Sequence, residues 1–291
     1  MIYVIFGPTG SGKTEVANKL SDTLNAPIIN ADAFQIYKDM NIGTAKIPTS
    51  DSHYKKHYLL DIKTPEESYS VKEYQDDFRR TYDELSKTYK DVIVSGGTGL
   101  YIRAALFDYE FIEEEISTND YSNFTNEELF KKLETLDIEA SKKIHVNNRK
   151  RLIRALDLIV SSGKKKSDII NAQEHKVIYP DVRFLFLNPD REDLYEAINR
   201  RVDKMIEEGL VEEVKNLKAK YHLSSTATQA IGYKEILEYL DNKLSLEEAI
   251  ELIKKRTRNY AKRQVTFFKN QFKSEVFSSK TQLFKEILGN E

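Results

Sequence analysis

The chain has 291 residues, a formal net charge of −2 and no cysteine, so it is long enough for one large domain or two smaller ones. The lack of cysteine excludes disulfides, thiolate nucleophiles and cysteine-based zinc sites, and the five histidines show no metal-ligand spacing. The N-terminus does not resemble a signal peptide, and no apolar segment approaches the roughly 20 residues of a membrane span. We therefore expect a cytoplasmic protein with no membrane partner.

The first predicted elements are a strand over Ile2–Phe6 and a glycine-rich loop over Gly7–Thr14. Apolar residues recur at helical spacing in the stretch Glu15–Leu24, so the loop connects a strand to a helix. In that context its backbone N–H groups can surround a diphosphate, with Lys13 at the outer phosphate and the Thr14 hydroxyl on Mg²⁺. The loop has the phosphate-binding pattern G-x-x-x-x-G-K-[ST] and consists of Gly7, Pro8, Thr9, Gly10, Ser11, Gly12, Lys13 and Thr14.

Short apolar runs follow at Ile28–Ile29, Leu59–Ile62 and Val92–Val94, separated by helical stretches. This alternation predicts a parallel sheet covered by helices. Asp32 comes just after the first of these runs, and ligands bind beyond the carboxyl ends of parallel strands, so Asp32 should face the same crevice as the phosphate loop. Its carboxylate could hold Mg²⁺ through water, act as a general base or cap a following helix, and its position alone leaves these three roles open.

The run Val92–Val94 leads into Ser95, Gly96, Gly97 and Thr98. Adjacent glycines let the backbone approach a ligand, and Thr98 could offer its hydroxyl to a phosphate or a bridging oxygen. An ordinary strand-to-helix turn would explain the same residues. The run does not end in the aspartate that is common in nucleotide-hydrolysing enzymes, so phosphoryl transfer is less well supported than phosphate binding.

The second half of the chain is mainly helical. We interpret Phe111–Thr125 as a connection and Asn126 to Gly163 as a continuously helical insertion, after which a strand at Val182–Leu187 should rejoin the parallel sheet. Further helices are expected at Arg191–Glu208, Val211–Lys220, Tyr233–Leu240, Leu246–Lys273 and Lys280–Leu288. The predicted fold is α/β, with a P-loop NTPase-like parallel sheet core over 1–110 and 180–291, a helical insertion domain over 111–179 and a helical C-terminal region.

Two segments are strongly basic. Residues 141–166 contain nine lysines or arginines against one acidic residue, and residues 251–274 contain eight against one. A single run of this kind is usually a solvated helix face. Two localised runs in a slightly acidic chain indicate surfaces that can meet the phosphates of a nucleic acid.

Six stretches together carry a family resemblance. In chain order they are GPTGSGKT, INADAFQIYKDMNIGTAK, HYLLDI, SGGTGLY, QAIGYKE and TRNYAKRQVTFF. The ordered set resembles the bacterial tRNA dimethylallyltransferases, a family of isopentenyl transferases, over nearly the whole chain. The resemblance implies transfer of a dimethylallyl group from dimethylallyl diphosphate to the exocyclic amine of the adenosine adjacent to the anticodon of tRNA, with Mg²⁺ as cofactor.

The resemblance also implies roles for individual residues. Asp32 would be the general base for the attacking amine, while Lys13, Thr98 and the loop amides would stabilise the departing diphosphate. The adenine must leave its stack to react, and the residues after Asp32 would help to hold it. The implied tRNA contacts are Asp32, Ala33, Phe34, Gln35 and Thr98 in the core, Arg149, Lys150, Arg151 and Arg154 in the insertion, and Arg258, Lys262, Arg263 and Gln264 near the C-terminus.

Three other functions are alternatives to this interpretation. A P-loop small-molecule kinase would share the loop and an aspartate base, but it would consume ATP. An adenylate isopentenyltransferase making free cytokinin would share the core, but it would have little use for two basic segments. An RNA-binding module could retain the loop as a relic. For the favoured interpretation, a tRNA-modifying transferase, we expect a monomer.

Overall fold

The computed structural model describes residues 1–109, 111, 119–172 and 175–289. The chain divides into two compact units, one formed by Met1–Leu106 with Tyr179–Glu291 and the other by Phe107–Ile178. The second unit begins and ends close to the limits 111 and 179 expected for the insertion. Glu113–Glu115, in the expected connection, lie outside the described residues.

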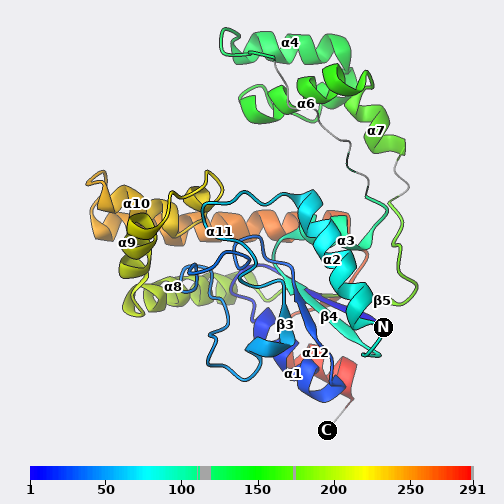
Figure 1. Ribbon diagram of the computed structural model, residues 1–291, viewed down its shortest axis with the longest axis vertical. Coiled ribbons are helices and arrows are strands. Elements are labelled where there is room, and N and C mark those ends of the chain that lie inside the picture. Colours follow the sequence, from blue (N-terminus) through cyan, green and yellow to red (C-terminus); the bar gives the residue numbers. More distant parts are fainter. Residues whose placement is uncertain (110, 112–118, 173–174, 290–291) are drawn as a thin grey trace. The chain divides into compact units, whose positions relative to one another are not determined.

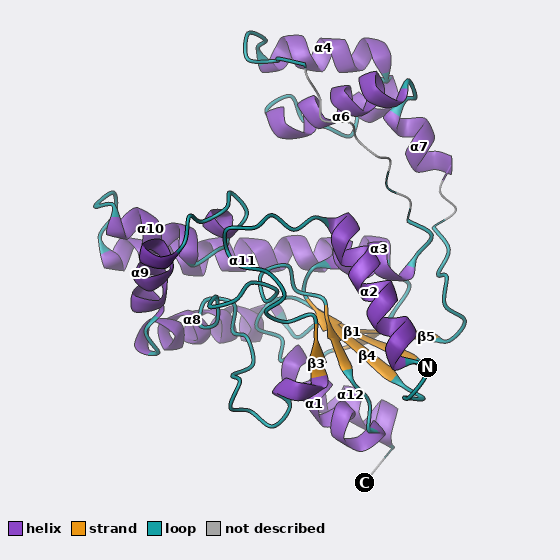
Figure 2. Ribbon diagram, viewed as in Figure 1, coloured by secondary structure: helices purple, strands orange, loops and turns teal. Residues whose placement is uncertain are grey.

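Six strands of the described residues form one sheet in the order β3-β2-β4-β1-β5-β6, and every neighbouring pair is parallel (Figure 2). The expected return of the chain to the parallel sheet at 182–187 is confirmed, since β5 pairs with β1. The strands are β1 (Ile2–Phe6), β2 (Ile28–Asn30), β3 (His57–Tyr58), β4 (Val92–Gly96), β5 (Val182–Leu187) and β6 (Glu275–Phe277).

Helices cover both faces of this sheet, α1 and α12 on one side and α2, α3 and α11 on the other (Figure 1). The helices of this unit are α1 (Lys13–Leu24), α2 (Val71–Leu85), α3 (Gly99–Leu106), α8 (Arg191–Glu207), α9 (Leu210–Lys220), α10 (Tyr233–Leu240), α11 (Leu246–Gln271) and α12 (Lys280–Leu288), with 3-10 turns η1 (Tyr54–Lys56) and η2 (Ala227–Gln229). In the described part of the chain, no helix combines the length and the apolar character that a membrane span requires.

The two faces of the sheet have different cores because successive side chains of a strand point to opposite sides. Under α1 and α12, aliphatic side chains such as Ile5 and Leu185 are fully buried. On the opposite face, the rings of Phe6 and Phe186 stack with their centroids 5.3 Å apart. Both rings also contact Phe268 of α11, which attaches this long helix to the sheet.

One strand prediction and one helix boundary need correction. The strand expected at Leu59–Ile62 lies earlier, at β3, because Leu59 and Asp61 have φ of 61° and 53°, left-handed conformations that cannot continue a strand. The helix expected to run to Lys273 ends at Gln271. It is followed by the short edge strand β6, which the apolar pattern did not indicate.

The insertion forms a small helical unit with its own apolar core, which includes Leu129, Leu133 and Leu152. The expectation that residues 126–163 are helical throughout is not met, because residues 142–148 form no helix. Asp137 leaves the helical conformation, and its Oδ1 accepts a hydrogen bond from the Ala140 N–H at 3.0 Å to begin a new helix. The helices are α4 (Asn126–Leu136), α5 (Ile138–Ser141), α6 (Arg149–Ser162) and α7 (Lys166–Ala172).

Candidate active site

The phosphate loop follows β1 and depends on glycine at several points. Gly10 and Gly12 have φ of +84° and +89°, conformations that other residues rarely adopt. A Cβ at Gly7 would come within 2.2 Å of the last carbonyl oxygen of β5. Because α1 begins at Lys13, the N–H groups of its first turn face the loop. Within the described residues, the buried Ser11 hydroxyl has no hydrogen-bond partner.

Asp32 lies two residues beyond β2 and is held by short-range hydrogen bonds. Its N–H donates to Asn30 Oδ1 at 3.1 Å, and its Oδ1 accepts from the Phe34 N–H at 3.0 Å. The second bond closes a turn, since residues 33–36 form no helix. The helix cap considered for Asp32 is therefore wrong, and the carboxylate instead has its orientation set by the turn.

Thr98 supports the backbone beside Asp32. Its hydroxyl accepts a hydrogen bond from the Ala33 N–H at 3.0 Å, and its own N–H donates to the Ala31 carbonyl at 3.0 Å. Gly96 permits this close approach, because a Cβ there would lie 2.1 Å from the Ala31 oxygen. The Thr98 hydroxyl thus has a structural role in holding the Asp32 turn, and its contact with a phosphate stays a prediction.

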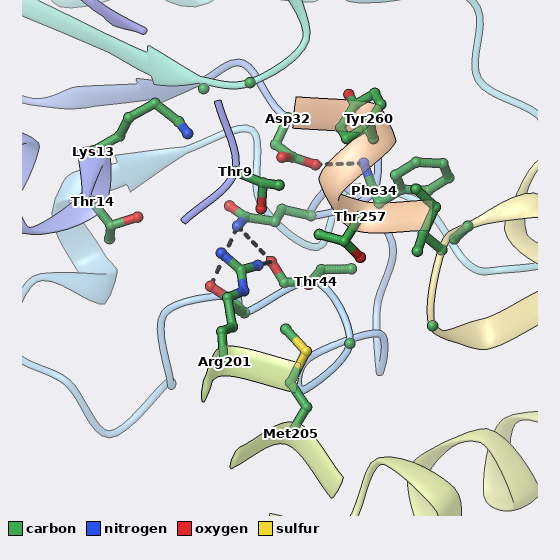
Figure 3. A pocket seen from close by; sticks show the side chains of 18 of the residues that line it. Thr9, Lys13, Thr14, Asp32, Phe34, Thr44, Arg201, Met205, Thr257 and Tyr260 are labelled. Carbon is green, nitrogen blue, oxygen red and sulfur yellow. Dashed lines mark hydrogen bonds between the residues drawn. The ribbon is translucent and has the colours of Figure 1, made fainter. Parts of the chain in front are cut away.

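These segments open into a pocket of about 320 Å³ (Figure 3). We call its two sides the strand-end wall, formed by Thr9, Lys13, Thr14, Asp32, Gly96 and Gly97, and the helical wall, formed by Arg201, Met205, Tyr233, Tyr260, Arg263 and Gln264. Phe34 and Gln35 also line the pocket. The structure thus brings Lys13 and Thr14 into one cavity with Asp32, as the positions at the ends of parallel strands suggested.

Arg201 reaches the pocket from α8 and was not identified from the sequence. Its Nη2 donates to the Thr44 carbonyl at 3.3 Å, and Figure 3 shows the two residues beside each other. Arg201 follows the buried Ile198 by three residues and precedes the buried Met205 by four, so it lies on the same helix face. The neighbouring Arg200 is exposed and pairs with a glutamate one turn earlier. Arg201 could have been identified from the sequence as a cation on the apolar face of a predicted helix.

Three charged groups influence one another in this pocket. Burial, and then the positive charge of Arg201, lowers the pKa of Lys13 to about 7, while Asp32 opposes the shift. Burial likewise lowers the pKa of Arg201, again opposed by Asp32. The Lys13 ammonium donates to the Pro8 carbonyl at 2.8 Å. A bound anion would favour the charged form of Lys13 and reduce its repulsion with Arg201.

Gln264 of α11 is a buried brace between two loops. Its Oε1 accepts from the Thr9 N–H at 2.9 Å, and its Nε2 donates to the Gly97 carbonyl at 2.8 Å. A Cβ at Gly97 would lie 2.6 Å from that nitrogen, so only glycine allows the contact. One helical turn earlier, burial and then the charge of Asp32 raise the pKa of Tyr260, which keeps its phenol protonated. A tRNA contact by Gln264 stays a prediction.

The cations expected to meet tRNA on α11 also have contacts within the protein. Arg258 Nη1 donates to Asn199 Oδ1 at 2.6 Å and so joins α11 to α8. The charged groups of Lys262 and Arg263 lie over tyrosine rings, 5.9 and 5.8 Å from their centroids. These contacts hold the long side chains in place on the helical wall and next to it.

In the insertion, Arg149 differs from its neighbours. Its guanidinium donates to the backbone carbonyls of Tyr121 at 2.6 Å and Phe124 at 2.7 Å, so it stabilises the insertion itself. The remaining cations of α6 that were expected to contact tRNA are exposed, namely Lys150, Arg151 and Arg154. Their contact with RNA stays a prediction.

Comparisons with known proteins agree on one family. The family model for IPP transferase matches residues 35–271. A tRNA dimethylallyltransferase from Bacillus mycoides is 43% identical over 277 residues, covering 93% of this chain and 87% of the relative. The crystal structure of a tRNA delta(2)-isopentenylpyrophosphate transferase from Staphylococcus epidermidis matches with a TM-score of 0.71 and 35% identity, covering 99% of this chain and 97% of that one. A eukaryotic dimethylallyltransferase acting on tRNA matches with a TM-score of 0.82 and 28% identity, over 98% of this chain and 75% of that one. The chain therefore belongs to the IPP transferase family.

Proposed function

We propose that this protein transfers a dimethylallyl group from dimethylallyl diphosphate to the exocyclic amine of the adenosine adjacent to the anticodon of tRNA. The observation that carries the proposal is the shared pocket, in which Asp32 faces the same cavity as Lys13 and Thr14 of the phosphate loop. A phosphate-binding loop beside a carboxylate suits a reaction in which a diphosphate leaves and an amine loses a proton. The family membership of the chain supports the same reaction.

In the proposed reaction the adenine nitrogen attacks the allylic carbon of the donor. A new carbon–nitrogen bond forms, the carbon–oxygen bond to the diphosphate breaks, and the proton of the amine passes to Asp32. A base is needed because the lone pair of the exocyclic nitrogen is delocalised into the ring. The turn that fixes the Asp32 carboxylate supports this assignment.

The departing diphosphate accumulates negative charge, and cationic or N–H donor groups surround its expected place. Lys13 and Arg201 supply positive charge, while the loop amides and the start of α1 supply N–H groups. The buried, unpartnered Ser11 hydroxyl is an additional donor that an oxygen of the ligand could satisfy. The roles of Gly7–Thr14 and Thr98 as diphosphate ligands belong to this proposal.

Mg²⁺ is part of the proposal, with the Thr14 hydroxyl as its protein ligand. No cluster of three or more acidic or histidine side chains suited to a metal occurs in the described residues, so the other ligands would be diphosphate oxygens and water. Thr14 fits this role because it is exposed in the first turn of α1 and lines the pocket. When bound, Mg²⁺ would neutralise charge on the leaving diphosphate.

Residues of each compact unit are proposed to contact tRNA. Next to Asp32, Ala33, Phe34 and Gln35 would hold the extruded adenine, since Phe34 and Gln35 line the pocket. The exposed cations of α6 and those along α11 would contact the RNA backbone. The residues proposed for these backbone contacts are Lys150, Arg151, Arg154, Arg258, Lys262 and Arg263.

The decisive test is transfer of label from radiolabelled dimethylallyl diphosphate to unmodified tRNA, followed by digestion to nucleosides. We expect labelled isopentenyladenosine, and label that never reaches RNA contradicts the proposal. Parallel reactions with free adenine nucleotides and with labelled ATP separate the alternatives, since a cytokinin-forming enzyme would label the nucleotide and a kinase would consume ATP. The family comparisons do not favour either alternative.

A further inference from the structure

One carboxylate outside the strand-end wall holds an entire segment of the pocket. We call this segment, Asn41–Thr44, the 41–44 loop; its residues Gly43 and Thr44 line the cavity. Glu213 of α9 accepts hydrogen bonds from three successive N–H groups of the loop, at 3.0 Å from Asn41, 2.8 Å from Ile42 and 3.2 Å from Gly43. Three donors converging on one anion hold the loop in a single conformation.

The Glu213 carboxylate is itself held by Tyr233 of α10. The Tyr233 hydroxyl donates to Glu213 Oε1 at 2.6 Å, and a Cβ at Gly43 would come within 2.4 Å of the tyrosine ring. Burial raises the pKa of Tyr233 well above its usual value, so this hydroxyl keeps its proton. The loop, α9 and α10 therefore meet at one hydrogen-bonded point that requires glycine at position 43.

The 41–44 loop in turn reaches the charged centre of the pocket. The Thr44 carbonyl accepts from Arg201 Nη2 at 3.3 Å and from Gln35 Nε2 at 3.1 Å. A guanidinium has a fixed planar geometry, so a carbonyl that binds one of its nitrogens sets the direction of the others. A shift of the loop would therefore move the acceptor that orients Arg201.

We propose that Glu213 is a positioning residue for the transfer reaction, acting through the 41–44 loop and the Thr44 carbonyl to aim Arg201 at the diphosphate. The proposal rests on the proposed function, because it assigns the diphosphate as the partner of Arg201. Glu213 acts through the loop, which also accepts a hydrogen bond from Gln35, so its substitution should impair use of the donor more than it changes affinity for tRNA.

The test compares Glu213→Gln with Glu212→Gln in steady-state transfer assays. Glutamine keeps the size of the side chain, but its NH₂ group would face N–H donors of the loop. We expect kcat/KM for dimethylallyl diphosphate to fall about 10- to 100-fold, the usual cost of misplacing a catalytic group by about 1 Å, with a much smaller change in the tRNA Kd. Glu212 is the matched control because it is the adjacent residue on α9 and forms an ion pair with exposed Lys215 at 3.5 Å.

A double-mutant cycle with Arg201→Lys separates positioning from general damage. If Glu213 acts through Arg201, Glu213→Gln should lower kcat/KM for dimethylallyl diphosphate by less than about three-fold in the Arg201→Lys background. An equal fall in kcat/KM in the wild-type and Arg201→Lys backgrounds would overturn the proposal and leave Glu213 a purely structural residue. A wild-type protein that transfers no dimethylallyl group overturns the proposed function as well, so the two failures are distinguishable.

Tyr233→Phe keeps the test decisive if Glu213→Gln does not fold. This variant removes one hydrogen bond to the carboxylate and leaves the three loop contacts in place. We expect a smaller fall in kcat/KM for the donor, of about three- to ten-fold, that again disappears in the Arg201→Lys background. A fall that persists there, or no fall at all, contradicts the proposal.

Discussion

The two walls of the pocket are assembled in different ways. The strand-end wall collects Lys13, Thr14 and Asp32 from segments that directly follow β1 and β2, so the order of the parallel sheet brings them together. The helical wall brings Arg201 and Gln264 from α8 and α11, and helix packing decides that they line the same pocket. We infer that the first wall holds the reacting groups and that the second orients them.

The largest effect is expected from the strand-end wall. Asp32→Ala should slow single-turnover transfer by about 10²- to 10⁴-fold, the usual cost of losing a general base, while tRNA affinity stays largely intact. Rapid-quench assays with saturating donor and tRNA would measure the chemical step. Equal rates for the variant and the wild type would remove Asp32 from the mechanism and reverse the roles given to the two walls.

On the helical wall, Gln264→Leu should leave the Thr9 N–H and the Gly97 carbonyl unpaired and cost about 1–3 kcal/mol of unfolding free energy. Urea denaturation would measure this loss. Gln264→Glu is the matched variant, since it retains an acceptor for Thr9 but faces the Gly97 carbonyl with an anion. Gln264→Glu should weaken binding of dimethylallyl diphosphate more than Gln264→Leu does. Unchanged stability of the leucine variant would mean that the brace is unimportant.

The pH dependence of donor binding tests how the walls interact, since Arg201 contributes to lowering the pKa of Lys13 to about 7. Below that pH Lys13 is charged in the free protein and attracts the diphosphate; above it, binding must take up a proton. The kcat/KM for dimethylallyl diphosphate should therefore fall as pH rises above 7, by at most about ten-fold per unit. Lys13→Arg stays charged, so its kcat/KM should not show this fall above pH 7. Identical pH profiles for the wild type and Lys13→Arg would show that Lys13 does not cause the fall.

The smallest effect is expected for cations of the insertion. Replacing Lys150 and Arg151 together with alanine should weaken tRNA binding a few-fold and reduce the slope of log K against log salt by about 1.4 to 1.8, while kcat at saturating tRNA stays unchanged. Arg149→Ala is the contrasting variant. It should destabilise the insertion by about 1–3 kcal/mol, because its guanidinium holds two backbone carbonyls. An unaltered salt slope would show that the exposed pair does not meet RNA.

Much of the fold could be predicted because its signals are local. The phosphate loop, the β1 and β5 strands and the helices of the second half each follow from apolar spacing and turn residues within a short window. The exceptions are elements that local patterns do not specify. The β6 strand is three residues long and exists through its pairing with β5, and β3 is displaced because Leu59 and Asp61 adopt left-handed conformations.

The same division holds within the site. The sequence by itself determined the loop Gly7–Thr14 and the position of Asp32 at a strand end, because both depend on contiguous residues and one rule of parallel sheets. Only the tertiary structure decided that Gln264 braces the phosphate loop and that Arg201 enters the pocket. Such roles depend on which side chain meets which backbone group across more than 150 residues of chain, and that outcome is set by helix packing.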